Sequence, residues 1–225
     1  MSDLTLAELD RDGALLDPLA ALQGSSRAEF LSRAALGGGA LLGALLAPIP
    51  AEAKPSHKQD VAILNFALSL EYLQDSFYTE VERMGGFRGP LGEQARTVAA
   101  HERAHVVALR DVLGGKAVKR GRYDFRGATE SRDAFRRTAV AFEDLAVAAY
   151  KGQAPRIANT GYLVAALGLH TVEARHAAWI RRLAGKTPAE NAFDEPRSAK
   201  STLGVVASTK FVLQTRSRRS PRFTG

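Results

Sequence analysis

Two copies of one helical pattern occur in the sequence, and this repeat constrains the fold more than any other feature. In each copy a lone glutamate, Glu71 or Glu143, stands seven residues before a tyrosine. A Glu-x-x-His motif follows the lone glutamate after 31 residues in the first copy and 30 in the second. These motifs, Glu102–His105 and Glu173–His176, each precede an arginine and a glycine at offsets of eight and twelve residues. A repeated helical hairpin is the simplest explanation.

The chain after Ala53 is expected to form four helices. Apolar residues recur at three- and four-residue spacing from 57 to 84, which is typical of an amphipathic helix. Glycine pairs, a capping Ser131, and Gly152 with Pro155 bound further helices at about 91–113, 131–151 and 156–184. Residues 116–130 are predicted to be a long surface connection. Two short loops and one long connection predict an all-α four-helix bundle with one crossover.

Segments at both ends lie outside this predicted bundle. We expect a signal-like segment at 1–53, the bundle at 54–187 and an irregular C-terminal extension at 188–225. Within the extension, residues 202–211 can form a short helix. The last ten residues carry four arginines and are predicted to be disordered.

The spacing of each Glu-x-x-His motif indicates that its two side chains point into the bundle. Three residues turn a helix by about 300°, so the Glu and His of each motif lie one turn apart on the same face. These faces also carry apolar residues, so the carboxylates are expected to point into the bundle, where an unpaired charge costs several kcal/mol. Four glutamates and two histidines cannot neutralise one another, whereas two divalent cations would do so.

Composition limits the kind of metal site. The chain has no cysteine, which excludes disulfides, thiolate zinc sites and iron–sulfur clusters, so carboxylates and imidazoles must bind any metal. The alternative is that the six side chains form salt links with Arg103, Arg110, Arg175 or solvent. The sequence predicts a di-metal site with six ligands: Glu71, Glu102, His105, Glu143, Glu173 and His176.

Several stretches resemble a known family. They are 63–73, Phe77-Tyr78, 100–105, 149–152 and 172–177. Their sequences are similar to those of the ferritin-like superfamily, in particular the bacterial branch that includes desiccation-related proteins. The resemblance covers roughly residues 57–183. It implies that the lone glutamates are terminal ligands, that the glutamates of the two motifs bridge the ions, and that each histidine binds one ion.

Four further residues lie near the predicted ligands. Asp75 and His170, one turn from a ligand glutamate, could orient ligands, although a core histidine with satisfied nitrogens is the alternative for His170. Tyr78 and Tyr150 could bond to a carboxylate or relay an electron, although simple packing is the alternative. His101 points about 100° away from its neighbour Glu102, so we expect it on the flank.

The resemblance implies two functions. In the first, two Fe or two Mn ions react with O2 or H2O2 in a ferroxidase, a peroxide scavenger or a manganese catalase. In the second, the metal is structural in a stress- or desiccation-related envelope protein. Iron and manganese accept the same ligands, so the sequence does not choose between them. A third interpretation, DNA protection through the arginine-rich tail, ranks last, and nucleic acid is not an expected partner.

The ends of the chain suggest a location. Residues 26–31 resemble a twin-arginine export signal with Ala28 in place of the second arginine, and Ala51-Glu52-Ala53 resembles a signal-peptidase site. We expect export to the periplasm, envelope or medium, with an uncleaved anchor and a cytoplasmic location as alternatives. The net charge is +7. A basic tail suits anionic cell-wall polymer or lipid headgroups, and the alternative is that the surplus of arginine only keeps the protein soluble. A monomer or small oligomer is expected.

Overall fold

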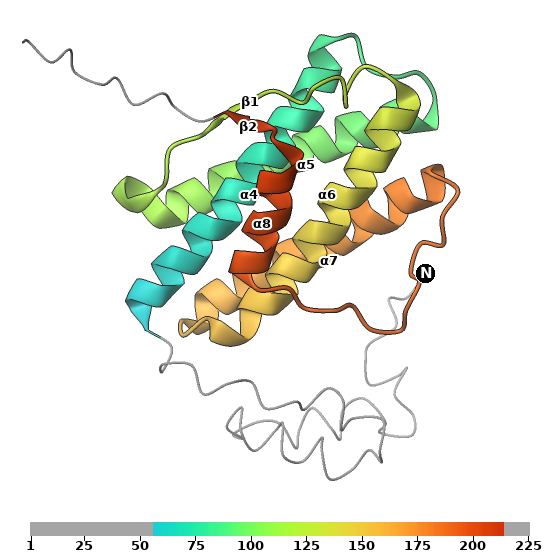
Figure 1. Ribbon diagram of the computed structural model, residues 1–225. Helices are drawn as coiled ribbons and strands as arrows, with labels where there is room; N and C mark the ends of the chain where they lie inside the picture. Colours follow the sequence, from blue (N-terminus) through green and yellow to red (C-terminus); the bar gives the residue numbers. More distant parts are fainter. Residues whose placement is uncertain (1–55, 214–225) are drawn as a thin grey trace, which may run out of the picture. The chain divides into compact units, whose positions relative to one another are not determined.

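The computed structural model describes residues 56–213, so the signal-like segment and the last arginines lie outside the described residues. Four long helices form a bundle, and this confirms the predicted all-α class (Figure 1). They are α4 (His57–Arg83), α5 (Pro90–Leu113), α6 (Arg132–Gln153) and α7 (Thr160–Leu183). Short 3-10 helices, η1 (Gly114–Lys116) and η2 (Ala154–Arg156), follow α5 and α6. Among the described residues, no helix combines the length and apolar character needed to cross a membrane.

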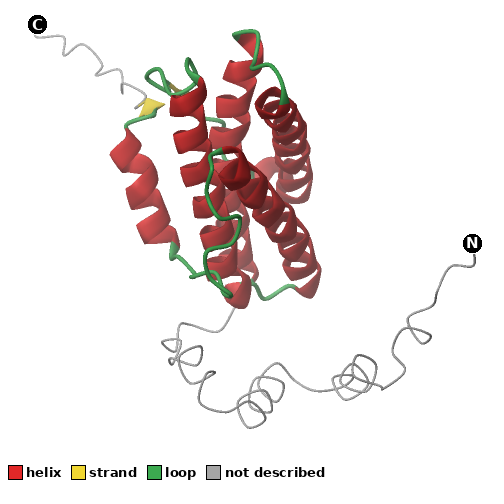
Figure 2. Cartoon of the chain, turned by 90° about the vertical axis from the view of Figure 1, so that its right-hand side faces the viewer, coloured by secondary structure: helices red, strands yellow, loops and turns green. Residues whose placement is uncertain are grey.

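The bundle consists of two helical hairpins. Helix α4 packs on α5, and α6 packs on α7; the hairpins meet where α4 contacts α6 and α5 contacts α7 (Figures 1 and 2). Two apolar clusters form the core. One is rich in aromatic side chains, with Phe77 stacked on Phe135 at a centroid distance of 5.4 Å. The other is mainly aliphatic and includes Ile63, Leu64 and Ile157.

The long connection between α5 and α6 runs along α4, and side chains of α4 hold it at several points along the helix. The Asn65 amide donates to the Lys116 carbonyl (2.9 Å), Arg120 pairs with Asp75, and Thr129 donates to Glu80 (2.7 Å). Phe125 is buried and stacks edge-on against Phe77. The connection was expected on the surface, but its apolar residues complete the aromatic end of the core.

Helix ends follow local capping chemistry. Ser56, Ser131 and Asn159 each accept a hydrogen bond from the backbone N–H of the third residue of α4, α6 and α7. The expected start of the fourth helix at Arg156 is wrong by four residues. There η2 closes the turn, and buried Asp60 accepts hydrogen bonds from the backbone N–H groups of residues 158 and 159, so α7 begins only at Thr160.

The C-terminal extension is more regular than the sequence suggests. It contains α8 (Ala199–Thr209), which packs on α6 (Figure 1), with Thr202 and Val206 buried. Strand β2 (Val212–Leu213) then pairs antiparallel with β1 (Arg122–Tyr123) of the long connection. Helix α8 and strand β2 therefore both attach the extension to the rest of the described chain.

Gly152 has a different role from the helix end expected of it. Helix α6 continues through Gly152 to Gln153. The extension crosses at this point, where the Arg197 backbone N–H donates to the Ala148 carbonyl at 2.8 Å. A Cβ at position 152 would lie 2.1 Å from the Arg197 carbonyl oxygen. Glycine therefore allows the two backbones to approach.

We expect Gly152→Ala to destabilise the protein by about 1–3 kcal/mol, because the added methyl group overlaps backbone rather than a flexible side chain. Gly168→Ala is the matched control, since nothing lies within 4 Å of a Cβ there. The control should stabilise α7 by about 0.5–1 kcal/mol. Urea unfolding measures both changes, and equal effects at the two glycines would contradict the close approach at Gly152.

Candidate metal centre

The structure brings all six predicted ligands together in the interior of the bundle. Each long helix contributes to the cluster: α4 and α6 supply one glutamate each, and α5 and α7 supply the Glu-x-x-His motifs. The four glutamates are at most 1% exposed, and both histidines are buried. The cluster lies between the two apolar clusters, so the surrounding core shields it from water.

The six side chains form two overlapping ligand sets, and within each set the candidate ligand atoms lie within 4.8 Å of one another. The first set contains Glu71 and His105, the second contains Glu143 and His176, and Glu102 and Glu173 belong to both. Each set offers three carboxylates and one imidazole, which suits iron or manganese.

The two shared glutamates face both sets, one oxygen to each. Oε1 of Glu173 lies 3.1 Å from Nδ1 of His105, and its Oε2 lies 3.6 Å from Nδ1 of His176. Glu102 is arranged in the same way, with Oε2 3.8 Å from His105 and Oε1 3.3 Å from His176. Two carboxylates placed like this can each bridge a pair of ions.

The lone glutamates are held by tyrosines from the other hairpin. Tyr150 of α6 donates to Oε1 of Glu71 on α4 at 2.5 Å, and Tyr78 of α4 donates to Oε1 of Glu143 on α6. Both tyrosines thus bond to a carboxylate, the first of the two roles considered for them. Burial, followed by the nearby carboxylate charge, raises the pKa of each phenol well above its ordinary value, so both remain donors.

Burial makes the metal-free carboxylates hard to ionise. It raises the pKa of Glu143 to about 7 and that of Glu102 well above its usual range, with repulsion from Glu173 adding to the second shift. For Glu173 burial acts in the same direction, but its ion pairs with both histidines lower its pKa to about 2. Because Glu102 and Glu173 occupy equivalent positions, we interpret this as one proton held by the pair.

The imidazoles compensate for part of this charge. Burial alone would lower their pKa, but the carboxylates close to each ring raise the pKa of His105 and of His176 to about 12. In the metal-free protein both rings therefore carry an extra proton. A bound cation would displace these protons and take over their role.

Unpartnered atoms support metal binding by these residues. Among the described residues, both carboxylate oxygens of Glu102 and of Glu173 and Nδ1 of His176 are buried and, apart from the ion pairs between glutamates and histidines, have no hydrogen-bond partner. A buried acceptor left unpaired costs about 1–3 kcal/mol, and more if it is charged. The arginines considered as salt partners do not bind these glutamates: Arg103 pairs with Glu82 on the surface. The donor set fits divalent cations.

Two of the expected ligand-orienting residues lie elsewhere. Asp75 does not reach a histidine, because Arg120 of the long connection pairs with it and Thr79 donates to its other oxygen. His170 is half-buried, and its Nδ1 has no hydrogen-bond partner among the described residues, so it is neither a ligand's partner nor a satisfied core histidine.

Two other residues contact the ligands instead. His101 is exposed, as expected of a position on the flank, but its Nδ1 lies 2.9 Å from Nε2 of His176 and the two rings stack. The Gln74 amide donates to Oε2 of Glu143 at 3.3 Å. Gln74 lies one helical turn after Glu71, a spacing that could have identified it. His101 contacts a ligand on another helix, which no spacing within α5 reveals.

Comparisons with known proteins place the chain in a family context. A sequence model of the family described as "Ferritin-like domain" matches residues 59–186. The match covers more than half of the chain and includes all six candidate ligands. A search of curated proteins finds no match for the chain.

Metal affinity should rise with pH. Below pH 7 Glu143 and both imidazoles hold protons that ligation must displace, so each displaced proton should make binding about tenfold tighter per pH unit. Calorimetric titration with Mn(II) between pH 5.5 and 7.5, in buffers of different ionisation enthalpy, measures both affinity and proton release. Glu143→Gln should reduce the number of protons released by about one below pH 7. Affinity that does not change with pH would contradict the assignment.

His101→Leu should weaken the binding of one of the two ions by up to about tenfold, because Nε2 of His176 loses its contact with the ring that orients it. The equivalent position in the other hairpin is Val172, so no ring supports His105 in this way and the second ion should be unaffected. Stepwise Mn(II) titration separates the two affinities. Exposed His57→Leu is the control, and identical titrations of both variants would refute the role of His101.

Proposed function

The chain belongs to the ferritin-like domain family, and from this premise we propose that it binds two iron or two manganese ions and uses them to oxidise a substrate with O2 or H2O2. The observation that carries the proposal is the pair of buried ligand sets that share Glu102 and Glu173. When bound, the two ions would supply adjacent one-electron redox centres. The protein contributes a closed, water-poor interior and a fixed ligand geometry.

The geometry of the lone glutamates supports terminal roles for them. In each case a tyrosine occupies Oε1, while Oε2 faces the histidine of the same set. Oε2 of Glu71 lies 3.2 Å from Nδ1 of His105, and Oε2 of Glu143 lies 3.6 Å from Nδ1 of His176. The tyrosine hydrogen bond would therefore direct one oxygen of each carboxylate to an ion and keep its orientation fixed.

A second candidate is a structural metal site in a non-enzymatic stress protein. The buried, unpartnered carboxylates favour it, because cations that neutralise them would stabilise the fold whether or not a reaction follows. The two functions share every contact in the centre. They differ in whether turnover can be lost while the fold remains.

Glu102→Gln and Glu173→Gln distinguish the two. We expect two iron or two manganese ions per chain by elemental analysis of the native protein. Protein loaded with Fe(II) should consume O2 or H2O2 faster than free Fe(II), and each variant should lose that activity while circular dichroism still shows the helices.

Exposed Glu93→Gln on α5 is the control and should retain metal and activity. If native protein consumes neither oxidant faster than free Fe(II), and the two buried variants lose only melting temperature, the structural role is correct and the oxidase proposal fails. Native protein without bound metal would reject both functions.

A further inference from the structure

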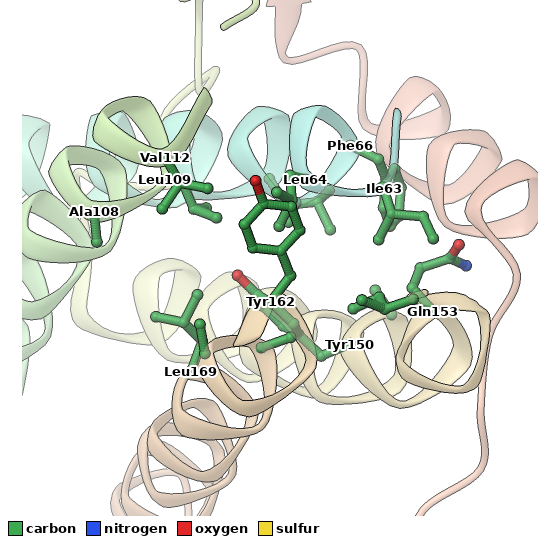
Figure 3. Close-up of a pocket in the computed structure, with 16 residues that line it drawn as sticks. Ile63, Leu64, Phe66, Ala108, Leu109, Val112, Tyr150, Gln153, Tyr162 and Leu169 are labelled. Atoms are coloured by element: carbon green, nitrogen blue, oxygen red, sulfur yellow. The ribbon is translucent and has the colours of Figure 1, made fainter. Parts of the chain in front are cut away.

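An apolar cavity of about 150 Å³ lies beside the candidate metal centre, and all four long helices line it (Figure 3). Its walls are almost entirely carbon. Buried Ile63, Leu64 and Ala149 lie on its inner side. Apolar cavities of this size stay dry and bind molecules such as benzene or xenon. The cavity is therefore suited to an organic molecule rather than to water.

The internal repeat supplies a reference for this cavity. Three residues that line the cavity, Ala149, Leu70 and Ala108, are smaller than their equivalents in the other repeat. These equivalents are Phe77, Phe142 and Trp179, respectively. Phe77 and Phe142 are buried in the aromatic cluster, where they pack at a centroid distance of 5.1 Å. The bundle can thus fill this volume with side chains, and it does so at one end only.

The cavity has an open side and a closed end. Ala108 and Val112 of α5 and Ala165 of α7 line it and are exposed, so its mouth lies between these two helices. Gln153 lies at the opposite end from Ala108 and Val112 (Figure 3) and is only 4% exposed. A molecule would therefore enter between α5 and α7 and stop at the end beside Gln153.

The closed end offers no polar group to a ligand. Oε1 of Gln153 accepts from Nη1 of Arg156 at 3.0 Å, and Nε2 of Gln153 is fully buried. The walls around a bound molecule are therefore carbon at this end as well.

The cavity also touches the metal centre through Tyr150. The ring of Tyr150 lines the cavity, and its hydroxyl donates to Glu71. We propose that this cavity binds a small, uncharged and apolar organic molecule of about benzene size, which lies against the ring of Tyr150. Its identification as the organic substrate of the centre rests on the proposed function; the binding itself does not.

Matched probes test the binding directly. Cyclohexanone and cyclohexane are titrated into the full-length, zinc-loaded protein and followed by methyl NMR, with zinc as a diamagnetic stand-in for the ions. We expect saturable shifts at Ile63, Leu64 and Ile157. Cyclohexanone should bind at least about threefold more weakly than cyclohexane, because its carbonyl loses its hydrogen bonds to water and finds no donor in the carbon-lined walls.

Filling the cavity should remove binding. Ala149→Phe copies the residue of the other repeat and should weaken both probes at least tenfold; Ala165→Phe blocks the exposed mouth and serves if the buried variant does not fold. Val107→Phe adds the same bulk on the exposed surface of α5 and should leave binding unchanged. Shifts confined to other methyl groups, or unaltered affinity in both filling variants, would overturn the proposal. If the native protein has no oxidase activity but binds the probes as described, only the proposed function is overturned.

Discussion

Burial of four carboxylates at one level of the bundle is the constraint on which the rest of the structure depends. Such a cluster is unfavourable unless donors and cations surround it. Two imidazoles and two phenols supply the donors, and the phenols do so across the hairpins: Tyr78 reaches Glu143, and Tyr150 reaches Glu71. The same contacts that satisfy the carboxylates therefore also tie α4 to α6, so the chemistry of the centre and the assembly of the bundle are linked.

Spacing within single helices was enough to predict the fold and to bring the six side chains together. A Glu-x-x-His motif has only one arrangement on a helix, and a repeat at matched separation requires two similar hairpins that can face each other. The predicted contacts that failed depend on partners outside the helix concerned. Asp75 has a spacing suited to a ligand partner, but Arg120 in the long connection pairs with it. No periodicity in α4 contains that information.

Gly152 illustrates the same limit for the backbone. A glycine before Pro155 is typical of a helix end, and the local pattern cannot distinguish this from a close approach by a distant segment. The Arg197 carbonyl, 45 residues further along the chain, lies where a Cβ at position 152 would be, so only glycine fits there. Sequence patterns therefore predict which residues form a helix, but not which residues form the contacts between segments that are distant in the sequence.

The two hairpins have the same ligands but differ in the residues that surround them. The surroundings of Glu143 and His176 therefore differ from those of Glu71 and His105. Glu143 and His176 have added partners, Gln74 and His101, where the other copy has Ala146 and Val172. Glu71 has no such amide, and its tyrosine borders the apolar cavity. Two ions in this centre would have similar ligands but different surroundings. The better supported ion would be suited to a fixed role, and the ion beside the cavity would be the one placed to act on a bound molecule.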